Sequence, residues 1–252
     1  MEPITINSAT DLLNRLQEPS EFQMYRGHAD GARKLIPYIA RFDLAKIGYD
    51  DWITFQDDIL SKFKKYALPY LDSRPESQHD WLIIAQHHGV PTTLLDWTTN
   101  PLKALFFAIE NPSLDDKDGA IWAFEPKTYL EDLTRLHSLL GDDYLRDFLC
   151  YFPAHITPRV IAQESCFTFF PLRSSAKPVP PLENIKYYKD KVVKLVKFRI
   201  PGKRKDMCRH ELAKLGISHR SLFPGLDGVA KSIRREIQAG YVADTDCIPS
   251  SH

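Results

Sequence analysis

The chain has 252 residues, of which 43% are hydrophobic and 26% are charged. This composition is typical of a globular protein with a packed core and excludes an intrinsically disordered chain. The 33 Lys and Arg residues equal the 33 Asp and Glu residues, but the two signs are unevenly distributed. Residues 186–235 contain fifteen basic and four acidic side chains, which leaves 18 basic and 29 acidic side chains elsewhere. We therefore expect the last third to bind a polyanion or an acidic partner.

Cysteine and targeting patterns exclude several further classes of protein. The four cysteines are far apart and form no CxxC pair, which argues against a zinc ribbon. The opening residues lack the basic region of an export signal, which argues against a disulfide framework. No apolar run approaches the roughly 18 residues that cross a bilayer. We expect a cytoplasmic protein with no membrane contact and, because no HExxH or second ligand pair occurs, no metal.

The chain up to residue 89 predicts three helices and one strand. Residues 8–16 place leucines at helical spacing after Ser and Thr capping candidates, and residues 50–71 repeat apolar side chains every three to four positions. Residues 21–27 alternate and end in glycine, as a strand does at a sheet edge. Residues 81–88 predict a helix that ends at Gly89.

Residues 91–112, PTTLLDWTTNPLKALFFAIENP, form the most informative segment. A short apolar run is followed by a polar turn and then by a helix, with Thr99 or Asn100 as its cap and Pro101 at its first position. This helix is apolar nearly all round, so we expect it to be central and buried.

The rest of the chain predicts strands and helices without strict alternation. It contains strands at 119–124, 159–170 and 192–200, a helical region at 128–149, a Pro-rich loop at 172–184, and helices at 203–215 and 227–239 that end at Gly216 and Gly240. Such an order favours an α+β fold. We expect one domain over residues 21–240, preceded by an N-terminal helix within residues 1–20 and followed by a tail at 241–252.

Three motifs resemble the FRG domain family, which is named for a Phe-Arg-Gly signature. The signature occurs here as Tyr25-Arg26-Gly27, with Tyr in the aromatic position. Residues 85–98, AQHHGVPTTLLDWT, resemble the family's longest motif, and residues 222–228, LFPGLDG, resemble its closing motif. Together the motifs span about residues 22–235. The family name by itself implies little chemistry.

A more distant resemblance implies a chemistry. ADP-ribosyltransferases carry an Arg on their first strand, a Ser-Thr-Ser strand that leads into an Ala-rich helix, and a Glu on a later strand. This chain has Arg26, then Asp96-Trp97-Thr98 before an apolar helix, then Gln163-Glu164, in the same order. The resemblance implies a mixed central sheet with helices packed around it, NAD as substrate, and catalytic residues Arg26, Thr98, Gln163 and Glu164. FRG-like proteins also resemble components of bacterial defence and toxin systems, which implies an antitoxin or inhibitor as partner.

The Tyr25-Arg26-Gly27 signature suits contact with NAD. The Arg26 guanidinium can hold two phosphate oxygens of the pyrophosphate as a bidentate fork, while Gly27 permits close approach of the backbone. The alternative is that Arg26 pairs with a carboxylate and ties the sheet to the long helix.

The second motif supplies further candidates for contact with NAD. His87 and His88 differ in helical phase by about 100°, so only one of them can face a pocket. We favour His88, whose alternative role is to interact with the helix end. Asp96 follows an apolar run and must be paired, either with an arginine or histidine or as the cap of the next helix. Trp97 is a further cofactor contact, and Thr98 is a hydrogen-bond partner for the nicotinamide ribose or a cap.

The third element of the resemblance to ADP-ribosyltransferases, Gln163-Glu164, decides which side chain assists catalysis. If residues 159–170 form a strand, Gln163 and Ser165 share one face and Glu164 lies on the other, so only one of the pair enters a pocket. The pattern that resembles the family places the polar residue at Gln163, which we predict to contact the ribose. A glutamine is not a base. Proton removal would then need Glu164, His88 or Asp96, or an acceptor such as an RNA base.

A basic stretch at residues 186–205 interleaves Lys and Arg with aromatic residues. Such a pattern suits a nucleic-acid backbone and unstacked bases. The candidate contacts are Lys194, Lys197, Arg199, Lys203, Arg204 and Lys205. The alternatives are a solvated face, or a contact surface for the acidic part of the chain or for an acidic partner.

Three functions follow in order of preference. The first is an ADP-ribosyltransferase that moves ADP-ribose from NAD to a macromolecule, with RNA favoured as acceptor. The second is a non-catalytic RNA-binding or protein-binding module, in which Arg26 and Asp96 form a structural pair and residues 186–205 bind. The third is a hydrolase of nucleotide or RNA phosphodiesters that uses His88 and Asp96.

Overall fold

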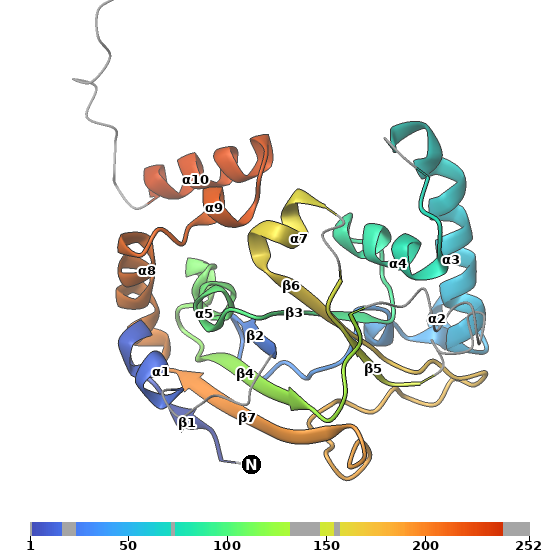
Figure 1. Ribbon diagram of the computed structural model, residues 1–252, viewed down its shortest axis with the longest axis horizontal. Helices are drawn as coiled ribbons and strands as arrows, with labels where there is room; N and C mark the ends of the chain where they lie inside the picture. The colour runs from blue at the N-terminus through green and yellow to red at the C-terminus, as the bar shows by residue number, and fades with distance from the viewer. Residues whose placement is uncertain (1, 17–23, 72–73, 132–146, 154–156, 239–252) are drawn as a thin grey trace, which may run out of the picture.

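A seven-stranded mixed sheet forms the centre of the protein (Figure 1). The computed structural model describes residues 2–16, 24–71, 74–131, 147–153 and 157–238. The strands are β1 (Ile4–Thr5), β2 (Met24–His28), β3 (Leu94–Thr98), β4 (Gly119–Pro126), β5 (Leu149–Tyr151), β6 (Ser165–Phe169) and β7 (Val192–Ile200). Their order is β1-β7-β4-β2-β3-β6-β5, and of these neighbours only β1 and β7 are parallel. The α+β prediction is confirmed.

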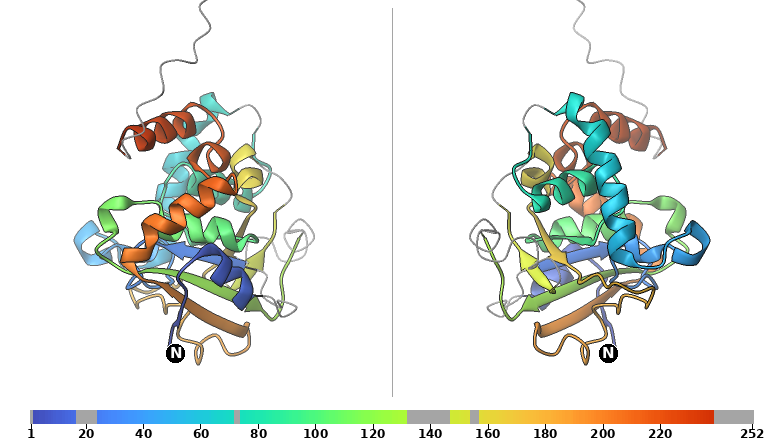
Figure 2. Two further views of the ribbon diagram at one scale, coloured as in Figure 1. Left: turned by 90° about the vertical axis from the view of Figure 1, so that its left-hand side faces the viewer. Right: turned by 90° about the vertical axis from the view of Figure 1, so that its right-hand side faces the viewer.

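Helices cover both faces of the sheet. They are α1 (Ala9–Arg15), α2 (Leu44–Ile47), α3 (Trp52–Ala67), α4 (Gln78–His87), α5 (Pro101–Ile109), α7 (Pro158–Gln163), α8 (Lys205–Lys214), α9 (His219–Leu222) and α10 (Leu226–Gln238), with short 3-10 turns η1 (Ile39–Arg41), η2 (Leu68–Tyr70), η3 (Pro112–Leu114) and η5 (Gly202–Arg204). The side views show α1 and α8 along one flank and α3 along the other (Figure 2). Most predicted helices are therefore confirmed to within a few residues.

Three clusters of buried side chains hold these layers together. On one face, α1, α5 and α8 pack against side chains of β2, β4 and β7. On the opposite face, Trp52 and Phe55 of α3 pack against β3 and β4 together with the loops at 35–44 and 170–188. The third cluster joins α3, α4 and α7 to β3, β5 and β6. Strands β4 and β6 are thus buried on both sides, which explains their apolar composition.

The predicted central helix is α5. The Asn100 side chain caps it by accepting a hydrogen bond from the Leu102 amide at 3.0 Å, and Pro101 occupies the first turn. Helix α5 lies so close to β2 that a Cβ atom on Gly27 would come within 1.9 Å of the Ala104 carbonyl oxygen. Gly27 therefore serves the packing of the helix on the strand, and it also lines the cleft described below, where we predicted contact with a cofactor.

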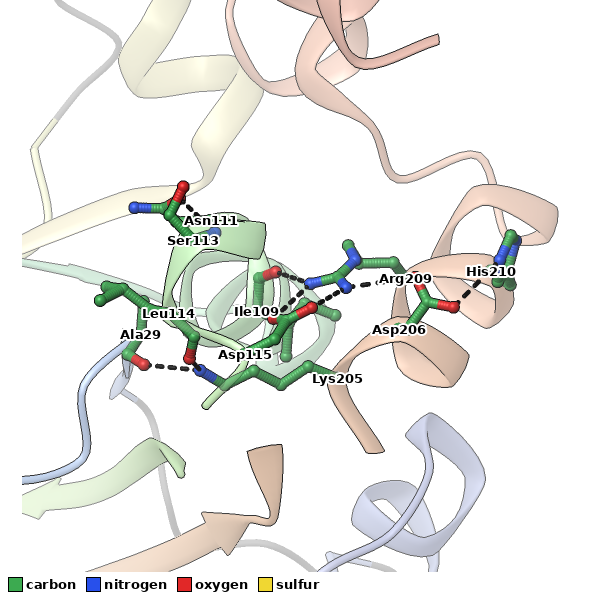
Figure 3. A network of polar contacts seen from close by, with 10 residues as sticks. All are labelled: Ala29, Ile109, Asn111, Ser113, Leu114, Asp115, Lys205, Asp206, Arg209 and His210. Atoms are coloured by element: carbon green, nitrogen blue, oxygen red, sulfur yellow. Dashed lines mark hydrogen bonds and ion pairs between the residues drawn. The ribbon is translucent and has the colours of Figure 1, made fainter. Parts of the chain in front are cut away.

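Helix α8 is tied to the end of α5 by polar contacts (Figure 3). Arg209 donates to the Ile109 carbonyl at 2.8 Å and to both carboxylate oxygens of Asp115. Lys205 is fully buried and donates to the carbonyls of Ala29 and Leu114 at 2.7 and 2.6 Å. These contacts also hold the residue that follows β2.

The predicted strand at residues 159–170 is wrong in its first half. Residues 158–163 form α7, which the Thr157 side chain caps and Pro158 begins. Glu164 then adopts a left-handed conformation, with φ of 47°, and β6 starts at Ser165. The Thr-Pro pair is a start signal for a helix and outweighs the β-branched residues that follow it.

The predicted helical region at 128–149 is only partly described. Residues 132–146 lie outside the described residues, as do the tail at 241–252 and Gly240. The prediction is wrong at its end, because Leu149 begins β5, and Leu130 forms an isolated bridge with Tyr151. At the N-terminus, β1 pairs with β7, so the first residues add a strand to the central sheet.

Candidate functional site

The sheet opens into a cleft between β2 and β3. These neighbours share one residue pair, Tyr25 with Thr98, whereas β2 pairs with β4 over five residues and β3 with β6 over five. Beyond that pair, β2 and β3 are not paired with each other, and the Asp96 carbonyl accepts from the Arg26 side chain instead. The cleft has a volume of about 460 Å³, within the usual range for a small-molecule site.

The cleft brings together residues that are far apart in the sequence. Arg26, Asp96, Thr98 and Gln163 all line it, as the sequence predicted for one common site. Ser165 and Phe167, which alternate along β6, line it too. The cleft also contains polar and charged residues that the sequence did not assign to it, namely His28, Arg33, Tyr38, Arg41, Gln86, His87, Glu110 and Arg159.

Arg26 is held by contacts on two sides. Its Nε donates to His28 Nε2 at 3.1 Å, and its Nη1 donates to the Asp96 carbonyl and lies 3.8 Å from the Asp96 carboxylate. Burial lowers the pKa of Arg26 to about 10, against the opposing effect of Asp96, so the side chain stays charged at neutral pH. Asp96 in turn accepts from Gln86 Nε2 at 2.7 Å. Asp96 therefore positions Arg26, one of the two roles we predicted for it.

A neutral His28 ring holds the Arg26 side chain through a hydrogen bond. It is buried, and because Nε2 accepts the Arg26 hydrogen bond, that nitrogen carries no proton. Burial, together with the nearby charges of Arg26 and Arg41, lowers the pKa of His28 to about 3. His28 is one residue beyond the predicted strand, and the period-two alternation with Arg26 was the signal that could have found it.

The cleft carries an excess of positive charge. Arg33, Arg41 and Arg159 line it in addition to Arg26, and in the described ranges no carboxylate lies within 4.0 Å of these three. Arg159 instead donates to the His87 carbonyl at 3.3 Å and lies over the Phe223 ring. Uncompensated guanidinium groups in a partly enclosed site attract phosphates and carboxylates.

Gln163 and Thr98 form the far wall of the cleft. Gln163 Nε2 donates to the Leu222 carbonyl at 3.2 Å, which connects the predicted closing motif to the site. The Thr98 hydroxyl donates to the Gln163 carbonyl at 2.7 Å and accepts from the Asn100 amide at 3.1 Å. The proton of this hydroxyl is therefore already used, and Thr98 takes the local structural role that we considered as its alternative.

Two predicted site residues, Glu164 and His88, lie outside the cleft. Glu164 points away from the cleft and forms an ion pair with Lys103 at 2.7 Å. His88 is exposed and outside the cleft, whereas His87 lines it, with a pKa that burial and Arg159 lower to about 4. Trp97 is among the residues that line the cleft, but its indole packs in the core and donates to the Thr168 hydroxyl at 3.0 Å. The helix phase and the left-handed turn at residue 164 decide these orientations.

The predicted nucleic-acid stretch is largely used inside the protein. Lys205 is fully buried, Arg199 pairs with Asp118 at 2.7 Å, and Lys197 donates to the Gly31 carbonyl at 2.7 Å. Lys194, Lys203 and Arg204 are exposed. Half of the predicted set is therefore engaged within the protein, Arg199 with a carboxylate and Lys197 and Lys205 with backbone carbonyls.

The described residues contain neither a cluster of candidate metal ligands nor a helix that could span a membrane. No group of three or more His, Cys, Asp or Glu side chains is placed there to hold a metal ion. No helix within the described ranges has the length and apolarity to span a membrane.

Comparison with known proteins finds one family model that matches part of the chain. Residues 21–117 match the family model of the FRG domain. This match covers β2, β3 and α5, and therefore Arg26, Asp96 and Thr98, but it ends before Arg159 and Gln163. No curated protein and no solved structure matches the chain.

Proposed function

We propose that this protein, in which residues 21–117 form an FRG domain, is an ADP-ribosyltransferase that transfers ADP-ribose from NAD to a macromolecule, with RNA as the favoured acceptor. The observation that carries the proposal is the convergence of Arg26, Thr98 and Gln163 on one cleft at the opening of the sheet. The three lie on separate elements and follow the order that the resemblance to ADP-ribosyltransferases implies.

The charge of the cleft suits the pyrophosphate of NAD. Arg26 is held in place by His28 and Asp96, so its guanidinium loses little conformational freedom when it binds a phosphate. Arg159 lies in the same cleft and adds a second cation. These two groups match the two negative charges of a pyrophosphate.

Gln163 is the residue that acts at the reacting sugar. Because its amide nitrogen is committed to Leu222, the amide oxygen is the group left to accept a hydrogen bond from a ribose hydroxyl. In the reaction the C1′–N bond breaks, nicotinamide leaves with the electron pair, and the acceptor forms a new bond to C1′ and loses a proton. A hydrogen bond to the 2′-hydroxyl strengthens as positive charge develops on the sugar. Asp96 is a cleft carboxylate available to take the acceptor proton.

The activity is tested with NAD labelled in its adenylate phosphate, incubated with purified protein and cellular RNA or lysate. We expect label to appear in the macromolecular fraction, and we expect Arg26→Ala to reduce transfer by about 100-fold or more, as loss of a charge-stabilising donor does in other enzymes. Arg26→Lys should fail as well, because an ammonium group lacks the bidentate fork.

Arg15→Ala is the matched control, because Arg15 is an exposed arginine on α1 that is 54% accessible. This variant should transfer label at the wild-type rate. Absence of transfer by the wild type, or equal transfer by Arg26→Ala, would refute the proposal.

The biological role that we propose is a cytoplasmic toxin in a bacterial defence or toxin-antitoxin system, held inactive by an inhibitor protein. Both NAD and RNA are present in that compartment. The non-catalytic alternative has less support, since Lys197, Arg199 and Lys205 of the basic stretch are engaged within the protein.

A further inference from the structure

The loop that leaves β2 is anchored at two points in the core. Leu35 and Ile39 are fully buried. The Leu35 amide donates to the Glu183 carboxylate at 3.0 Å, and the Ile39 amide donates to the Thr92 carbonyl at 3.4 Å. The backbone of this loop is therefore held in place from both sides.

Three exposed side chains of this loop line the cleft. They are Arg33, Tyr38 and Arg41, which we call the rim. The Tyr38 side chain is 48% exposed, and its ring lies 5.5 Å from that of Phe42, which steadies it. The Arg41 guanidinium has one weak contact, at 3.5 Å from the Ile36 carbonyl. The rim thus presents two cations and an aromatic ring from a fixed backbone.

The rim adds more positive charge than NAD requires. Arg26 and Arg159 are partly buried and already balance a pyrophosphate, whereas Arg33 and Arg41 lie exposed at the outer side of the cleft. Burial and the charge of Arg33 lower the pKa of Arg41. Like charges placed together without a carboxylate favour an anionic ligand.

We propose that the rim is the acceptor subsite, where Arg33 and Arg41 bind phosphates of single-stranded RNA and Tyr38 stacks on a base. Cations beside an exposed aromatic ring are the combination by which proteins hold unpaired nucleotides, because every base has a face to stack and every link has a phosphate. A base held on Tyr38 lies at the mouth of the cleft, where its neighbour can reach the sugar bound near Gln163. This inference rests on the proposed function, because an acceptor subsite requires that the protein transfer ADP-ribose.

The site differs from the one predicted in the sequence. The stretch at 186–205 is engaged internally at Lys197, Arg199 and Lys205, whereas the rim arginines have no carboxylate partner among the described residues. Lys203 and Arg204 remain exposed on the 3-10 turn η5, outside the cleft. Replacing both residues removes two positive charges, as the rim double variant does, so they provide a matched control.

The test measures binding of a fluorescently labelled single-stranded RNA of about 12 nucleotides by anisotropy, without NAD, over a range of salt concentrations. We expect Arg33→Gln with Arg41→Gln to weaken binding at least tenfold. The same double variant should reduce the slope of log affinity against log salt by about 1.4, the value for two lost phosphate contacts. Tyr38→Ala should weaken binding by roughly five- to hundredfold, while Tyr38→Phe should not.

Lys203→Ala with Arg204→Ala should leave RNA binding unchanged. The rim side chains are exposed, so these variants should fold, and equal thermal denaturation midpoints check this. Three outcomes would overturn the inference. They are RNA binding that survives the rim changes, loss of RNA binding in the Lys203 and Arg204 double variant, and equally strong binding of duplex RNA.

Two further readings separate this inference from the proposed function. Equilibrium dialysis with labelled NAD should show normal NAD binding by the rim variants. A rim variant that no longer binds NAD but still binds RNA would assign the rim to the cofactor and overturn the inference. Rim-dependent RNA binding by a protein that transfers no ADP-ribose would instead support the rim and refute the transferase.

Discussion

Arg26 and His28 show how two adjacent side chains on one strand make a site. They are two residues apart on β2 and so project from the same face, where the His28 ring accepts the Arg26 Nε–H at 3.1 Å. A protonated His28 would place a second N–H and a second positive charge against the guanidinium. The arrangement therefore requires a neutral histidine, which burial and neighbouring arginines enforce.

This requirement predicts acid sensitivity. The pKa of His28 is about 3 in the folded protein and near 6.5 when unfolded, so between these values the unfolded chain binds more protons and stability falls as the pH falls. At pH 5 the loss relative to pH 7 is about 2 kcal/mol from this residue. His28→Gln keeps an acceptor for Arg26 and does not titrate, so it should lose about 2 kcal/mol less. Urea denaturation at pH 7 and pH 5 measures the difference, and an equal loss in both proteins would contradict the assignment.

At the scale of elements, the position of α5 against β2 determines the cleft. Gly27 lets the helix backbone contact the strand directly, with the Ala104 carbonyl where a Cβ atom would lie. Strand β2 is thereby held between α5 and β4, and β3 meets it at the Tyr25 and Thr98 pair before the two strands separate. The opening of the sheet follows from this packing.

Gly27→Ala should therefore destabilise the protein severely. The added methyl group meets backbone atoms at 1.9 and 2.6 Å, which cannot rotate away, so we expect a loss above about 3 kcal/mol. Gly89→Ala is the control, because nothing lies within 4 Å of its Cβ position and its φ of 79° alone costs about 1 kcal/mol. Urea denaturation compares the two variants. Similar stability of both would show that β2 and α5 are not in this close contact.

At the scale of the whole molecule, opposite charges from distant segments pair with each other. Arg199 pairs with Asp118, and Arg209 pairs with Asp115, so the basic last third contacts the acidic turn that follows α5. Figure 3 shows Arg209 and Lys205 reaching this turn from α8. These contacts join β7 and α8 to the turn after α5 and hold Ala29 at the start of the loop that carries the rim.

Removal of Arg209 should loosen this junction. Arg209 is 16% exposed and has a two-pronged contact with Asp115 as well as a bond to the Ile109 carbonyl, so Arg209→Ala should lower the free energy of unfolding by about 2 to 3 kcal/mol. Arg15→Ala removes an exposed pair with Asp11 and should change it by less than about 1 kcal/mol. Chemical denaturation of both variants is the measurement. Equal effects would mean that the Arg209 contacts contribute no more than a surface pair.

Much of the fold could be predicted because its signals are local. Caps, proline at the first helical turn and terminal glycines lie within a few residues of the element they define, as Asn100, Pro101 and Gly89 illustrate. The strand at 192–200 and the buried helix at 101–109 followed from short-range periodicity. The sequence by itself also singled out Arg26, Asp96, Thr98 and Gln163, because their residue types occur in a suggestive order.

Only the tertiary structure decided which of these side chains share a cleft and which charges are free to act. Gln163 faces the cleft, whereas the next residue, Glu164, has a left-handed backbone conformation and does not face it. The partners of Arg209 and Lys205 lie up to 176 residues away, so their engagement has no local signal. For the same reason the rim arginines, which are unremarkable in the sequence, become a site through packing. Local chemistry determined the elements, and long-range contacts decided the function they can support.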